Sequence, residues 1–112
     1  MDLINRPYVK RISILGGEPL AEENLFEVLN LVNKINILFP DKTIWLYTGF
    51  TWEQCMDSPL RKQAVSKCDV VIDGKYIDGL RDITLKWRGS VNQRVINVNE
   101  SLANDKVVLY CD

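Results

Sequence analysis

Two glycines and a carboxylate follow the first apolar segment of the chain. Gly16, Gly17 and Glu18 come directly after residues 12–15, which have the apolar, β-branched character of a buried strand. In open α/β folds, ligands bind beyond the carboxyl ends of the strands. Glycines there leave bare backbone that a ligand can approach, and a carboxylate offers an acceptor for a cationic group. A Gly-Gly pair after a strand is also a common tight turn, so the pattern alone leaves both interpretations open.

Two other predicted strands end in similar residues. Segment 43–47 is followed by Thr48-Gly49, and segment 70–72 by Asp73-Gly74-Lys75. Because helical segments separate these strands, two right-handed strand–helix–strand crossovers bring all three strand ends to the same edge of the sheet. Glycine, acid, hydroxyl and lysine groups at one edge suit a ligand that carries both an amine and a carboxylate. The alternative is that these are ordinary turn residues, in which such loops are rich.

The elements that position these residues follow from the spacing of apolar side chains. A strand is predicted over residues 9–15, and a helix begins near Glu22 and ends before Pro40. Thr51 and Gln54 form a capping box for a short helix, and Ser58-Pro59 marks the start of another. Two further strands are predicted, over residues 94–98 and 106–110. The apolar stripe of the first helix consists of Leu25, Leu29, Val32, Ile35 and Phe39. The pattern predicts an α/β fold, a mostly parallel sheet with flanking helices.

The length and composition are those of an ordinary globular protein. The chain has 112 residues, a length typical of one domain, and 46% of them are hydrophobic and 26% charged. Lys and Arg number 14 against 15 Asp and Glu, so the net charge of −1 argues against a strongly basic nucleic-acid surface. No apolar run reaches the length of a membrane span, and no secretory leader is recognisable. We expect a cytoplasmic protein with a single domain, residues 1–112.

The three cysteines do not form a metal-binding or disulfide pattern. The number of cysteines is odd, and none of the spacings between Cys55, Cys68 and Cys111 is that of a Cys-x-x-Cys motif. With this cysteine spacing and no histidine in the sequence, the chain offers no zinc-type ligand cluster. We expect all three to be structural or incidental thiols, and we predict no metal ligand and no catalytic residue in this chain.

A second unusual string lies downstream, Trp87-Arg88-Gly89-Ser90-Val91-Asn92-Gln93-Arg94. Together with segments 15–20, 41–51 and 69–76, it resembles the activating proteins of anaerobic ribonucleoside-triphosphate reductase, a family of the radical S-adenosylmethionine superfamily. The likeness runs from about Val9 to the C-terminus. The Gly-Gly-Glu element belongs to the wider superfamily, whereas the downstream string is much more particular to these activases.

The resemblance implies an enzyme that generates a radical. Such activases hold a 4Fe-4S cluster through a Cys-x3-Cys-x2-Cys loop, cleave S-adenosylmethionine reductively, and take a hydrogen from a glycine of the large reductase subunit. By similarity, the Gly-Gly-Glu element at 16–18 would contact the methionyl amino group. Thr48, Asp73 and Lys75 would line the rest of the S-adenosylmethionine site. The implied partners are the reductase subunit and an external electron donor.

The cluster loop of that family has no counterpart here. In the family it precedes the helix that leads to the Gly-Gly-Glu strand, whereas only eight residues stand before Val9. We therefore expect an incomplete radical-SAM partial (βα) barrel that lacks its first strand and helix. We also expect this chain alone to hold no cluster and to be inactive. Its strand 9–15 would be an exposed edge that pairs with a second copy or is covered by the N-terminal tail.

Four polar residues of the downstream string are candidates for contact with the reductase, namely Arg88, Asn92, Gln93 and Arg94. Planar polar side chains recognise backbone amides, so these residues could line the opening that admits the glycine loop. Alternatively, Asn92 and Gln93 tie an irregular loop to the sheet while Trp87 packs beneath it. Two other protein classes remain open, a non-catalytic module that docks on the reductase and an α/β domain that binds another small ligand.

Overall fold

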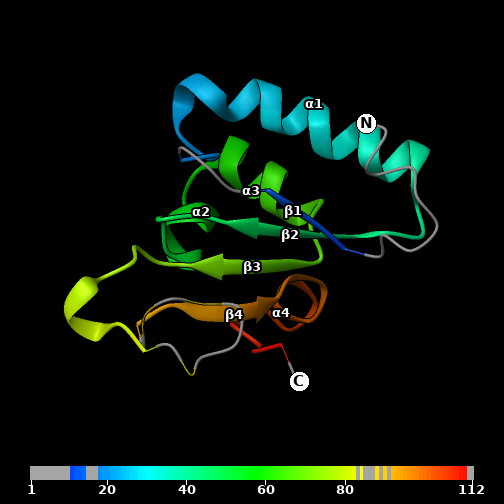
Figure 1. Cartoon of the computed structure of the whole chain (residues 1–112). Coiled ribbons are helices and arrows are strands. Elements are labelled where there is room, and N and C mark those ends of the chain that lie inside the picture. Colours follow the sequence, from blue (N-terminus) through cyan, green and yellow to red (C-terminus); the bar gives the residue numbers. More distant parts are fainter. Residues whose placement is uncertain are drawn as a thin grey trace.

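The protein folds around a four-stranded sheet (Figure 1). The computed structural model describes residues 11–14, 18–82, 84, 88, 90 and 92–110. Strands β1 (Arg11–Ile14), β2 (Thr43–Tyr47) and β3 (Val70–Asp73) are parallel, and β4 (Arg94–Asn97) is antiparallel to β3. The strand order in space is β1-β2-β3-β4, which leaves β1 at one edge of the described sheet. The predicted α/β class with a mostly parallel sheet is confirmed.

Three helices connect the parallel strands and cover one face of the sheet (Figure 1). Helix α1 (Glu22–Leu38) joins β1 to β2, while α2 (Trp52–Met56) and α3 (Pro59–Ser66) join β2 to β3. The predicted stripe of α1 is buried at Leu25, Leu29, Val32 and Ile35, but Phe39 is the C-cap and only half-buried. Among the described residues, none of the helices has the length and apolarity that a membrane span requires.

Apolar side chains are buried on both faces of the sheet. Ile12, Ile44 and Leu46 face the helices and belong to the main core. On the opposite face, Trp45 and Ile72 belong to a second cluster and are 4% and 0% exposed. Burial on both faces explains why the central strands β2 and β3 are nearly continuous apolar runs, whereas the edge strand β1 alternates, with Ser13 exposed between Ile12 and Ile14.

Both predicted helix starts are confirmed by their hydrogen bonds. The Thr51 hydroxyl accepts from the Gln54 N–H at 3.1 Å, and the Thr51 N–H donates to the Gln54 side-chain oxygen at 2.9 Å. This reciprocal pair is the capping box of α2. The Ser58 hydroxyl accepts from the Arg61 N–H at the start of α3.

The C-terminal part differs from the prediction. Strand β4 ends at Asn97, because the Asn97 side chain accepts from the Glu100 N–H at 3.1 Å and thereby caps a helix, α4 (Val98–Asn104). The predicted strand over residues 106–110 is wrong, since Leu109 makes only an isolated antiparallel bridge to Ile96. The segment nevertheless lies along β4, with the Tyr110 N–H donating to the Val95 carbonyl at 2.8 Å.

Gly74 connects β3 to the segment that follows, with a positive φ of 89°. An alanine at this position is expected to lower the free energy of unfolding by about 1–2 kcal/mol, because a side chain strains a left-handed backbone. Gly79 is the matched control: it has no positive φ, and no atom lies within 4 Å of an added Cβ. Urea unfolding of Gly74→Ala and Gly79→Ala measures the difference. Equal losses for the two variants would contradict the strain argument.

Candidate functional site at the carboxyl ends of the strands

The three predicted strand ends come together in one open depression of about 210 Å³. Glu18 follows β1, Thr48 follows β2, and Gly74 and Lys75 follow β3. The depression is also lined by Pro19, Tyr47, Gly49, Tyr76 and Gln93. Gly16 and Gly17 lie outside the described residues. The parallel register, in which Ile14 pairs with Leu46 and Tyr47 with Ile72, places these ends at the same edge.

The Glu18 carboxylate joins the end of β1 to the end of β2. One oxygen, Oε2, accepts from the Leu20 N–H at 2.9 Å and from the Thr48 hydroxyl at 2.7 Å. The other, Oε1, accepts from the Gly49 N–H at 2.6 Å. A carboxylate offers about four acceptor positions, so a further donor can still bind. A Cβ on Gly49 would lie 3.1 Å from Oε1, so glycine is the residue that permits this close approach.

Lys75 supplies a positive charge at the same depression. Its side chain is exposed, and its Cγ would lie 3.6 Å from a Cβ added to Gly49. Its backbone is held in place, because the Asn92 amide donates to the Lys75 carbonyl at 2.8 Å. The Gln93 amide donates to the neighbouring Gly74 carbonyl at 3.0 Å. A carboxylate from Glu18 and an ammonium from Lys75 at one depression can bind a ligand that carries both an ammonium and a carboxylate group.

Asp73 is buried behind this depression and is not among the residues that line it. Its Oδ2 accepts from the Trp52 N–H at 2.8 Å, at the first residue of α2. Its Oδ1 accepts from the backbone N–H of Arg94 at 3.1 Å, and the Arg94 guanidinium donates to both oxygens. Asp73 therefore ties the end of β3 to the start of α2 and the start of β4.

Arg94 also binds a second carboxylate, that of Glu53, at 2.7 Å. The hydrogen bonds that Arg94 donates to Asp73 and Glu53 raise the pKa of Arg94, and the bond to Glu53 lowers the pKa of the Glu53 carboxyl. We call Asp73, Arg94 and Glu53 the carboxylate–arginine cluster. No sequence signal marks Glu53 as a member, because it stands 41 residues before Arg94.

The remaining reductase-facing candidates make bonds within the protein. The Arg88 guanidinium donates to the Gln93 carbonyl at 2.6 Å. The Asn92 and Gln93 side chains bond to the backbone at Lys75 and Gly74. This agrees with the alternative interpretation, in which these two residues tie an irregular loop to the sheet. Gln93 also reaches the depression, whereas Trp87 lies outside the described residues. Sequence reasoning did not single out Tyr76 among the lining residues, and no spacing signal points to it.

The sequence of this α/β chain is similar to those of known proteins. A family model described as a 4Fe-4S single cluster domain matches residues 1–96, and the chain belongs to this family. It is 43% identical over 82 residues to the anaerobic ribonucleoside-triphosphate reductase-activating protein of Vibrio cholerae, covering 73% of this chain and 52% of that protein. The expected resemblance is thereby confirmed.

Two further relatives carry the same name. The protein of Enterobacteria phage T4 is 39% identical over 92 residues, covering 82% of this chain and 56% of the relative. That of Escherichia coli K12 is 38% identical over 94 residues, covering 82% and 60%. The matched region therefore spans between about half and three fifths of the length of these relatives. No solved structure gave a significant match.

The described cysteines do not fit a 4Fe-4S cluster. Cluster ligands are thiolates, which a low dielectric disfavours. Cys55 and Cys68 are 0% and 2% exposed, and burial raises the pKa of each thiol to about 12. Cys111 lies outside the described residues. Within the part of the chain that the structure describes, no group of three or more His, Cys, Asp or Glu residues could hold a metal ion.

Proposed function

We propose that this chain is the S-adenosylmethionine-binding part of an activating protein that generates the glycyl radical on anaerobic ribonucleoside-triphosphate reductase by reductive cleavage of S-adenosylmethionine. The names of the relatives support an activating role toward the anaerobic reductase. In this proposal the partner is the large reductase subunit. The observation that carries the proposal is that Glu18 and Lys75, two opposite charges, line the same strand-end depression. In this proposal the chain is a single domain, part of a radical-SAM (βα) barrel, and an external donor supplies the electron.

The residues of the depression have distinct roles in the proposal. Glu18, held by Thr48 and Gly49, accepts from the methionyl ammonium, next to the backbone of Gly16 and Gly17. Lys75 binds the methionyl carboxylate as a point charge. Asp73 acts from behind, because its bond to the Trp52 N–H fixes the segment that carries Thr48 and Gly49.

Titration with S-adenosylmethionine, followed by NMR, tests this binding role. We expect Glu18→Gln and Lys75→Met each to weaken binding by about tenfold, since the first removes the negative charge that strengthens the bond to the ligand ammonium and the second removes the charged donor to the ligand carboxylate. Glu27→Gln is the control, because Glu27 is exposed on α1 and does not line the depression. If neither site variant binds less tightly than the control, the strand ends are not the binding site.

A second candidate function follows from the buried cysteines. The described thiols do not provide cluster ligands, which favours a non-catalytic module that docks on the reductase. Anaerobic reconstitution with iron and sulfide, followed by a visible absorbance spectrum, tests whether this chain holds a cluster, and capture of the reductase subunit separates the two roles. A stable cluster would exclude the module. A colourless chain that captures the reductase subunit equally well as wild type and as Glu18→Gln would favour it over the S-adenosylmethionine-binding role.

A further inference from the structure

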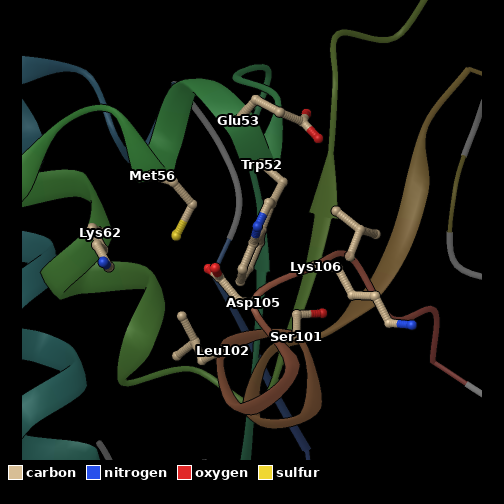
Figure 2. A pocket seen from close by; sticks show the side chains of 9 residues that line it. Trp52, Glu53, Met56, Lys62, Ser101, Leu102, Asp105 and Lys106 are labelled. Atoms are coloured by element: carbon tan, nitrogen blue, oxygen red, sulfur yellow. The ribbon is translucent and has the colours of Figure 1, made fainter.

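A second cavity, of about 400 Å³, lies between α2, α3 and α4 (Figure 2). It shares no lining residue with the strand-end depression. Its apolar walls are formed by Trp52 and Met56 of α2, Leu102 of α4, and Val107. The volume falls within the range of small-molecule sites in proteins, and the mixture of apolar walls with a few polar groups is typical of them.

One wall of this cavity is built rigidly. Asp105 ends α4 in the left-handed conformation, with φ 54° and ψ 36°. The Ser101 hydroxyl, 1% exposed, accepts from the Val108 N–H at 2.8 Å. The Lys106 N–H donates to the Ser101 carbonyl at 3.2 Å. The turn over residues 105–108 is therefore fixed before any ligand binds, which lowers the entropic cost of binding.

Four charged residues line the cavity, and two of them, Lys62 and Asp105, carry opposite charges that do not pair with each other. Within the described part of the chain, the side chains of Lys62 and Asp105 have neither a hydrogen bond nor an ion pair. Figure 2 shows the Asp105 carboxylate turned toward the middle of the cavity, while Lys62 approaches from α3. The Glu53 carboxylate is turned away and is bound by Arg94. Lys106 also lines the cavity, but Figure 2 shows its ammonium turned away from the middle. Lys62 and Asp105 are thus the cation and the anion that face the cavity beside its apolar wall.

We propose that this cavity binds a free apolar α-amino acid. The ligand ammonium binds Asp105, the ligand carboxylate binds Lys62, and its side chain packs against Trp52 and Met56. A ligand with a single charge satisfies only one of the two protein charges and is repelled by the other. A zwitterion satisfies both and leaves its apolar side chain for the apolar walls.

Titration of the ¹⁵N-labelled chain with L-leucine tests the proposal directly. The sequence contains three tryptophans, so three indole N–H signals can be assigned with single Trp→Phe variants. We expect a saturable shift of the Trp52 signal. Trp45 lines a different cavity, of about 410 Å³, so a shift at Trp45 instead would overturn the proposal. Leucine methyl ester and N-acetyl-leucine, which each lack one charge, should bind about fivefold more weakly than leucine.

Variants of the two charged residues complete the test. Lys62→Gln and Asp105→Asn should each weaken leucine binding by about fivefold. Asparagine tolerates the left-handed conformation at position 105, so the turn is retained. Lys34→Gln, an exposed charge change on α1, should have no effect. The absence of saturable binding, or an equal loss in Lys34→Gln, would overturn the assignment.

Discussion

Replacement of Asp73 by alanine is expected to lower the free energy of unfolding by about 3 kcal/mol. The side chain is 1% exposed and accepts from the Trp52 N–H and from Arg94. Without it, the N–H at the start of α2 loses its partner, and the Arg94 guanidinium retains only the exposed Glu53. Urea unfolding followed by tryptophan fluorescence measures the loss.

Two other substitutions make this result interpretable. Asp41→Ala removes an exposed carboxylate and should change the free energy of unfolding by less than about 0.5 kcal/mol. Asp73→Asn keeps an acceptor for the Trp52 N–H but loses the charge that pairs with Arg94. Its loss in the free energy of unfolding should therefore lie between those of Asp73→Ala and Asp41→Ala. If Asp73→Ala lowers the free energy of unfolding no more than Asp41→Ala does, Asp73 does not stabilise the junction of β3 with α2 and β4.

Cys55 and Cys68 are expected to react with iodoacetamide at pH 8 about a thousandfold more slowly in the folded chain than in urea. Burial raises the pKa of each thiol from 9.0 to about 12, and three pH units lower the thiolate fraction about a thousandfold. The measurement is made in a Cys111→Ser variant, so that only these two thiols are counted. Rapid labelling of both in the folded chain would show that they are accessible thiolates and reopen the question of cluster binding.

The same pKa shifts make stability depend on pH in a definite direction. The unfolded thiols release their protons above about pH 9, whereas the folded thiols keep them until about pH 12. The contribution to stability is therefore complete below pH 9 and is lost as pH rises from 9 toward 12. Each thiol removes up to about 1.4 kcal/mol per pH unit in that window. Cys68→Ala should reduce the slope of the free energy of unfolding against pH between pH 9 and 12.

The parallel half of the fold could be predicted because its signals are local. The capping box at Thr51 and Gln54, the Ser58-Pro59 start and the stripe of α1 each lie within one element, and each is present in the structure. Helix α4 was missed although Asn97 and Glu100 are spaced as an N-cap requires. The short apolar run that ends at Val98 suits a strand equally well, and a signal that favours two structures does not decide between them.

The candidate site was predictable only as far as topology determines it. Parallel strands with right-handed crossovers place Glu18, Thr48 and Lys75 at one edge, whatever the side chains do. The engagement of Asp73 depends on Trp52 and Arg94, each 21 residues away in the sequence. Such contacts are set by packing between elements, so no local pattern could show that this carboxylate is already bound.

The excursion over residues 74–93 leaves the sheet at Asp73 and returns at Arg94, and these two residues are directly paired across β3 and β4. The β3–β4 backbone pairing and the Asp73–Arg94 ion pair therefore hold the two strands together without any contribution from residues 74–93. The short 3₁₀ helix of the excursion, η1 (Asp78–Leu80), is exposed and lies nearer in sequence to β3 than to β4. A backbone cut within η1 would yield two fragments that remain joined as a noncovalent complex, so the protein could be assembled from two separately produced halves.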